Sequence, residues 1–330
     1  MGNSDNYSKE EFNDELSLRD IFLALWRHKV LIIIITIAAA FVAAVFSLFY
    51  LKPVYHARLN IIISMPETYR TKYGDYVMPI STNEQYVNLI TSNEVLKNTI
   101  EDMGYDGTGV TIEGLRNRIL IVQTDNKNTN QNSFEIRVAA GNPEEAKQLA
   151  EALYNNYIEF LDVMTVKGAV EYFIDYYSVQ LGSLEVELET NKELLERYNE
   201  LLKNTPMTIN QKEAIDSIKN SEKISDIIIM ENIINPNYTA LELDIIYIKQ
   251  TINAIESKIE LYNNYLKELE TEKSKISEYN NTGKFNEISN NIIRVTTSHV
   301  YLISKPVAPS RKTSPNNFRN ILIGAILGGM

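Results

Sequence analysis

Residues 30–51 read VLIIIITIAAAFVAAVFSLFYL, and this stretch decides how the rest of the 330-residue chain is organised. Only Thr36, Ser47 and Tyr50 carry polar side-chain atoms within these 22 residues. At a rise of 1.5 Å per residue, a helix of this length is about 33 Å long, enough for a hydrocarbon core of about 30 Å. The stretch is therefore predicted to be a transmembrane helix.

The residues before this span predict its orientation. A cleaved signal peptide is the alternative, but its apolar part has about 7–15 residues and follows a short basic segment. Here 29 residues precede the span, and six of them are acidic. Arg19, Arg27, His28 and Lys29 stand near its inner edge, so the positive-inside rule places residues 1–29 in the cytoplasm. The chain after the span is then expected outside the cytoplasm.

A second apolar run stands at the other end, where residues 321–330 read ILIGAILGGM. About ten residues cannot span a bilayer. We therefore expect the sequence to stop inside a second transmembrane helix, with a buried terminal segment as the alternative. Gly324 and Gly328 form a small-xxx-small pair that allows close helix packing, as do Ala39 and Ala43 in the first span. Glycine that lipid merely tolerates would give the same pattern.

Composition excludes several classes of function. The formal net charge is −11, with 43 acidic and 32 basic residues and no large basic block, which argues against nucleic-acid binding. The absence of cysteine excludes disulfides, thiol nucleophiles and Cys-ligated metals. The three histidines, His28, His56 and His299, are scattered and are expected to be satisfied surface or strand residues. No cofactor or metal is predicted.

Sequence motifs for catalysis are also missing. The only Gly-Lys pair, at residues 283–284, lacks the surroundings of a phosphate-binding loop, and GxSxG and HExxH do not occur. The glycines between residues 104 and 114 have the wrong spacing for a dinucleotide-binding loop. Glutamates of the long helical region, such as Glu185, are interpreted as a solvated helix face. The protein is therefore predicted not to be an enzyme.

Residues 52–145 and 284–319 are expected to form an α/β base domain beside the membrane. Residues 55–63 alternate between core-facing apolar side chains and outward ones, which predicts a strand. Residues 116–125 and 133–140 predict a further strand pair.

Between these strands the sequence predicts a loop and two helices. Residues 66–79 are polar and are expected to form the loop. It carries three tyrosines that either cover the base domain or stack on a sugar or partner: Tyr69, Tyr73 and Tyr76. Capping boxes that begin at Thr82 and Thr91 predict the two helix starts.

Residues 146–283 are expected to form a long helical arm. Asn142 followed by proline and two acidic residues predicts its start. The apolar stripe continues to the Thr205-Pro206 break, with room for a kink at Gly168 and Gly182.

After the break we expect a shorter helical piece over residues 209–234, ended by Asn235-Pro236, and then a second long helix. From Leu241 apolar residues follow a 4-3 repeat, and its 36 residues would be about 54 Å long, so the helix must project. The two striped helices predict an antiparallel hairpin, either a spacer that organises an assembly or an intramolecular coiled coil without a binding role. The expected stripe consists of Ile245, Ile248, Ile252, Ile255, Ile259, Tyr262, Leu266 and Leu269.

The chain is expected to return through a strand at residues 299–304 and a proline-rich segment. Its three prolines lack amide donors and fix their own backbone, which predicts an extended, unpaired approach to the membrane: Pro306, Pro309 and Pro315. The predicted fold class is therefore α+β, with a base domain and a long helical arm between transmembrane helices at residues 30–51 and from residue 320 to residue 330.

Together these features resemble the polysaccharide co-polymerases, the Wzz-type chain-length determinants of the bacterial inner membrane. Residues 16–32 are similar to the cytoplasmic approach to the family's first span, and residues 53–57 match the P-x-Y-x-A pattern that opens its first strand. Residues 142–161 resemble the helix that begins its arm, and the prolines precede a glycine-containing second span. Asn316 departs from the family, where lysine is common.

This resemblance implies a homo-oligomer, an octamer-like bell-shaped ring whose helical arms extend into the periplasm. It further implies a non-catalytic role in setting the modal length of a lipid-linked surface polysaccharide, such as O-antigen, made by a partner polymerase. The alternative from another class is a periplasmic adaptor subunit of an efflux or secretion system. Such an adaptor would have β-rich halves beside its hairpin and no second span.

Overall fold

The computed structural model describes residues 22–23, 26–123, 133–210, 232–282 and 299–330. It divides into two compact units. The first unit comprises Met1–Ile62, Ile90–Tyr154 and Leu302–Met330. The second comprises Ile63–Leu89 and Asn155–Tyr301, so that the long helix α6 (Pro143–Asn204) starts in the first unit and continues in the second.

A four-stranded sheet, with strand order β4-β5-β1-β8, lies mainly in the first unit. Its strands are β1 (Tyr55–Ile63), β4 (Ile119–Gln123), β5 (Ser133–Ala140) and β8 (Val300–Ser304). The central strand β5 pairs antiparallel with β1, where Tyr55 lies opposite Ala140, and with β4, where Ile119 lies opposite Val138. All four strands were predicted from apolar alternation or β-branched composition, and the structure confirms them.

The two faces of this sheet differ because successive side chains of a strand point to opposite sides. Leu59 and Ile61 of β1 and Ile136 of β5 are fully buried, whereas Arg58 and Arg137 lie on the other face. Helices α4 (Asn93–Asp102) and α5 (Ile112–Arg116) and the start of α6 complete the core of this unit. They contribute the buried residues Val95, Leu96, Leu115, Leu149 and Leu153.

Side-chain caps fix the helix starts. The Thr82 hydroxyl accepts a hydrogen bond from the Gln85 amide at 3.3 Å, which confirms the predicted start of α3 (Asn83–Asn88). The prediction that Thr91 caps α4 is wrong by one residue, because Thr91 belongs to a 3₁₀ turn and Ser92 accepts from the Val95 amide. Asn142 accepts from the Glu145 amide at 2.8 Å and starts α6 as predicted.

A β-hairpin replaces the loop predicted for residues 66–79. Strands β2 (Thr68–Thr71) and β3 (Gly74–Val77) pair antiparallel, and Tyr69 lies directly opposite Tyr76. Gly74 has a φ of +126°, a conformation that L side chains rarely adopt, and it lies at the tight connection of the hairpin. Tyr69, Tyr73 and Tyr76 are at most 6% exposed, so the structure buries these tyrosines.

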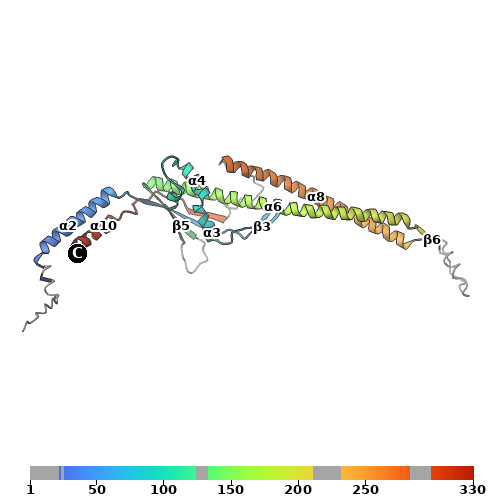
Figure 1. The fold of residues 1–330 in the computed structure, drawn as a ribbon, viewed down its shortest axis with the longest axis horizontal. Coiled ribbons are helices and arrows are strands. Elements are labelled where there is room, and N and C mark those ends of the chain that lie inside the picture. Colours follow the sequence, from blue (N-terminus) through green and yellow to red (C-terminus); the bar gives the residue numbers. More distant parts are fainter. Residues whose placement is uncertain (1–21, 24–25, 124–132, 211–231, 283–298) are drawn as a thin grey trace, which may run out of the picture. The chain divides into compact units, whose positions relative to one another are not determined.

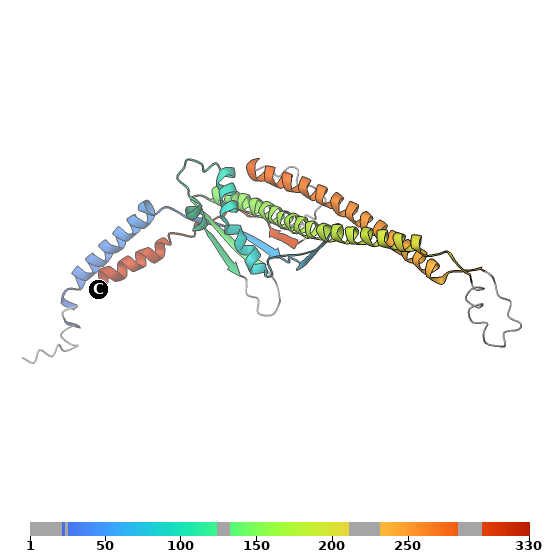
Figure 2. The same ribbon diagram turned by 45° about the vertical axis from the view of Figure 1, so that its right-hand side comes forward.

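The arm is an antiparallel pair of helices within the second unit (Figure 2). Helix α6 runs unbroken for 62 residues through Gly168 and Gly182, and α8 (Pro236–Thr282) runs for 47 residues. Tyr177 contacts Tyr262 with ring centroids 4.8 Å apart, and farther along Lys192 lies 3.5 Å from Glu256. Later residues of α6 thus contact earlier residues of α8, which confirms the predicted antiparallel hairpin.

At one end of this hairpin a small sheet replaces the predicted short helix. Strands β6 (Thr208–Asn210) and β7 (Asn232–Ile234) pair antiparallel, so the helical prediction for residues 209–234 is wrong at both ends. Residues 211–231 lie outside the described part of the chain. The Asn235 side chain accepts a hydrogen bond from the Asn237 amide at 3.0 Å, and this turn starts α8 at Pro236.

Two apolar helices lie side by side in the first unit (Figure 1). The first consists of α2 (Lys29–Val45) and a π-helical turn, η1 (Phe46–Tyr50), and the second is α10 (Asn317–Gly329). Within the described residues, Lys29–Tyr50 is the one helix long and apolar enough to cross a membrane, with a mean hydropathy of 2.9 over its most apolar window. This helix corresponds to the predicted first span.

Candidate functional site

The two apolar helices meet through the small residues that the sequence singled out. A Cβ atom placed on Gly324 would lie 2.5 Å from the Ala43 Cβ, and one on Gly328 would lie 2.6 Å from the Ala39 Cβ. Real Cβ atoms essentially never come this close, so glycine is required for the observed packing. The two small-xxx-small motifs therefore pack against each other within one chain.

A polar cluster joins the same two helices near residue 47. Ser47, which is 1% exposed, donates a hydrogen bond to Asn317 Oδ1 at 3.0 Å and accepts one from Asn320 Nδ2 at 2.9 Å. Lys312 Nζ also donates to Asn317 Oδ1, at 3.1 Å. Such bonds are directional, so the cluster fixes the register in which η1 and α10 meet.

The proline-rich segment before α10 is tied to the start of β1. The Val54 amide donates to the Ser314 carbonyl at 2.8 Å, and the Thr313 amide donates to the Val54 carbonyl at 2.8 Å. The prediction that this segment is unpaired is therefore wrong at this point. The residues between its prolines have backbone amides, and that of Thr313 donates a hydrogen bond. Of the predicted prolines, Pro306 and Pro315 are buried and Pro309 is half-buried.

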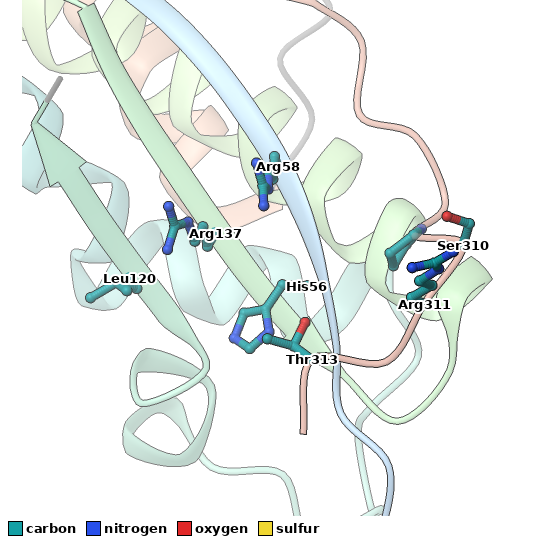
Figure 3. Close-up of a pocket in the computed structure, with 8 residues that line it drawn as sticks. His56, Arg58, Leu120, Arg137, Ser310, Arg311 and Thr313 are labelled. Atoms are coloured by element: carbon teal, nitrogen blue, oxygen red, sulfur yellow. The ribbon is translucent and has the colours of Figure 1, made fainter. Parts of the chain in front are cut away.

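A cavity of about 440 Å³ opens on the polar face of the sheet (Figure 3). Strands β1, β4 and β5 supply one wall, and the segment after β8 supplies the other. We call this cavity the basic pocket, and its lining residues are His56, Arg58, Leu120, Arg137, Pro309, Ser310, Arg311 and Thr313.

The basic pocket carries an excess of positive charge. Arg58 and Arg137 lie opposite each other on β1 and β5, and both approach one carboxylate oxygen of Glu135, with Nε–Oε1 distances of 3.5 and 2.7 Å. The Arg137 side chain lowers the pKa of Glu135 by hydrogen bonding, so this carboxylate is ionised. Arg311 makes no ion pair with any residue that the structure describes.

His56 is the exception to the expectation that each histidine is satisfied. Burial lowers the pKa of His56, and the charges of Arg137 and Arg58 lower it further. Its Nδ1 atom is buried and has no hydrogen-bond partner among the described residues. The imidazole is therefore neutral near pH 7.

The predicted stripe of α8 is only partly buried. Ile245, Ile248, Ile252, Ile255 and Leu269 are at most 8% exposed. The other three members, Ile259, Tyr262 and Leu266, are half-buried. The structure thus places the stripe against the rest of the second unit, and its role in assembly stays a prediction.

An aromatic cluster, missed in the sequence, joins the β2–β3 hairpin to the arm. Tyr73 contacts Phe173 of α6 and Tyr265 of α8, with ring centroids 5.8 and 5.2 Å apart. The Tyr177 hydroxyl donates a hydrogen bond to the Tyr73 carbonyl, and burial raises the pKa of each of these two tyrosines to about 12. The run YFIDYY at residues 172–177 is the sequence signal that could have indicated such a cluster.

The described residues include no group of three or more His, Cys, Asp or Glu side chains that could hold a metal ion. The recognisable sites are thus the packed helix pair, the basic pocket and the arm with its aromatic cluster. Hydrogen bonding, anion binding and packing are the chemistry that these residues offer.

Comparison with known proteins agrees with the expected family. Residues 14–103 match the family model of the chain length determinant protein, Wzz. The predicted resemblance to this family is confirmed. The matched region contains the first span, β1, the β2–β3 hairpin and α4.

One curated relative is the capsular polysaccharide biosynthesis protein CpsC of Streptococcus pneumoniae. It is 27% identical over 149 residues. The aligned part covers 44% of this chain and 61% of the relative, which is less than two thirds of the relative's length.

One solved structure that this chain resembles is that of a full-length bacterial polysaccharide co-polymerase. It is 16% identical, with 95% of this chain and 94% of that chain covered and a TM-score of 0.43. A fragment of the co-polymerase WzzB from Salmonella Typhimurium is 14% identical, with 79% and 100% covered and a TM-score of 0.28.

Proposed function

We propose that this protein regulates the chain length of a bacterial surface polysaccharide. The match of residues 14–103 to the chain length determinant family carries the proposal. The name of the relative from Streptococcus pneumoniae favours a capsular polysaccharide or a similar lipid-linked glycan as the polymer concerned. The chain acts without catalysing a reaction, because a partner polymerase in the membrane makes the polymer.

The proposal assigns a task to each part of the chain. The span at Lys29–Tyr50 anchors the protein in the bacterial inner membrane, and α10 is part of a second span. The sheet and its helices form a base beside the membrane, and the α6–α8 hairpin forms the arm on the outer side. Copies of the chain assemble into a ring-shaped homo-oligomer, which contacts the polymerase and its lipid-linked glycan.

Deletion of the gene tests this role, with complementation by the wild-type gene as the control. The length distribution of the surface polysaccharide is compared on a gel. Regulation predicts that the deletion strain still makes polymer but loses the preferred length, and that complementation restores it. An unchanged length distribution in the deletion strain would refute the proposal.

A further inference from the structure

We propose that the basic pocket is a binding site for a phosphoryl group, either as a soluble phosphate or diphosphate or as the headgroup of an anionic lipid. His56, Arg58 and Arg137 reach it from the sheet, and Arg311 reaches it from the segment before α10 (Figure 3). The pocket lies entirely within the first unit. Its volume of about 440 Å³ is within the range of small-ligand sites and exceeds the space that one phosphate needs.

Charge favours an anion over a neutral ligand. Three arginines and one glutamate leave two positive charges that the surrounding described residues do not balance. Arg311 has no carboxylate partner among the described residues, so it can bind an anion without breaking an ion pair that they form. The net charge of the whole chain is −11, so this local excess stands out against the rest of the protein.

The donor set favours a phosphoryl group among anions. Guanidinium groups present planar pairs of N–H donors that match phosphate oxygens, and such charge-assisted bonds are stronger than neutral ones. The hydroxyls of Ser310 and Thr313 line the same wall and can donate further hydrogen bonds. His56 lines the same pocket, and a bound anion would favour protonation of its imidazole.

The basic pocket lies close to the ends of both apolar helices. A lipid headgroup is for this reason one proposed source of the phosphoryl group. His56 follows Tyr50, the last residue of the candidate span, by six residues, and Arg311 precedes Asn317, the first residue of α10, by six residues. Six extended residues reach about 20 Å at most. The hydrogen bonds of Val54 with Thr313 and Ser314 hold both walls together over this short distance, so the pocket stays close to the ends of both helices.

Glu135 provides an internal test of the assignment. Its carboxylate already occupies donors of Arg58 and Arg137, so a phosphoryl group has to compete with it. Glu135→Gln removes the competing charge and should strengthen anion binding several-fold. If the Glu135 ion pairs have a purely structural role, Glu135→Gln should not strengthen anion binding, because loss of the pairs would only destabilise the packing of β1 against β5.

Titration of the full chain in detergent with inorganic pyrophosphate, followed by calorimetry, tests the proposal. Loss of one charge-assisted contact corresponds to about tenfold weaker binding or more, which we expect for Arg311→Gln. Arg197→Gln, on the arm, is the matched control and should bind like the wild type, because Arg197 pairs with Glu193 and is not among the residues that line the pocket. Arg311 is exposed and makes no ion pair within the described part of the chain, so its substitution should leave the fold intact.

Two results would overturn the assignment: pyrophosphate fails to bind the wild-type chain, or Arg311→Gln and Arg197→Gln bind it equally well. Nanodiscs of phosphatidylcholine, with and without phosphatidic acid, distinguish the two sources. Weaker pyrophosphate binding in the presence of phosphatidic acid supports a lipid headgroup in the pocket, and unchanged binding supports a soluble ligand. None of these readouts involves polysaccharide length, so the outcome is independent of the proposed function.

Discussion

Gly324 of α10 lies against Ala43 of α2, and a Cβ atom on the glycine would be 2.5 Å from the alanine Cβ. One turn farther along α10, Gly328 lies against Ala39, so the two helices run antiparallel. The end of the first helix and the start of the second are consequently on the same side of the pair.

Substitution Gly324→Val is expected to separate α2 from α10, because overpacking at a close contact costs about 1–3 kcal/mol. The chain has no native cysteine, so Ser47→Cys with Asn320→Cys allows a short thiol cross-linker to report the pairing. We expect a clear fall in cross-linking yield for Gly324→Val. Gly329→Val is the control, since its Cβ would meet only Thr36 Oγ1 at an ordinary 3.4 Å. Equal yields in both variants would contradict the role of Gly324.

The arm offers a matched pair of isoleucines for a second prediction. Ile252 is 8% exposed, whereas Ile246 on the same helix is 52% exposed. Burial of an unpaired carboxylate costs several kcal/mol, so Ile252→Asp should lower the unfolding temperature in detergent markedly, and Ile246→Asp should change it little. If the arm organises the assembly, Ile252→Asp also alters oligomer size and polysaccharide length. Similar unfolding temperatures for the two variants would contradict the packing of the stripe.

Much of the fold could be predicted because its signals are local. Alternation of apolar residues gave β1 and β5, and the side chain of Asn142 marked the start of α6. The small residues of the two apolar helices were also visible as motifs, although which motif contacts which emerged only from the structure. These features depend on residues within one or two turns of each other, where sequence patterns are most informative.

The structural features that the sequence did not reveal depend on contacts between residues that are far apart in the chain. The polar segment around Tyr73 forms a hairpin because its tyrosines are buried against α6 and α8, whose residues follow about a hundred positions or more later. The basic pocket was missed for the same reason, since Arg311 joins His56 from the far end of the chain. The short β6–β7 pair depends on the two arm helices meeting, which the pattern of residues 209–234 does not show.

Two glycines of α6 should respond in opposite directions to alanine. A Cβ on Gly182 meets nothing within 4 Å, so Gly182→Ala should stabilise the helix by about 0.5–1 kcal/mol. A Cβ on Gly168 would lie 2.5 Å from the Tyr76 hydroxyl, whose ring is buried, so Gly168→Ala should destabilise the protein by about 1 kcal/mol. Thermal unfolding of the two variants measures the difference. Stabilisation by both substitutions would show that the Tyr76 ring moves freely.

The pKa of His56 is expected to lie below the ordinary value of 6.5, because burial and the charges of Arg137 and Arg58 disfavour the imidazolium. The other charged groups near the imidazole are Arg311, which lines the same pocket, and Glu135, which pairs with Arg137. Because the unfolded chain binds this proton first as pH falls, the free energy of unfolding decreases from about pH 6.5 down to the folded pKa. NMR titration of the imidazole, assigned with His56→Gln, measures the value. Arg137→Gln should raise it part of the way towards 6.5, since burial remains, and a further decrease would contradict this electrostatic account.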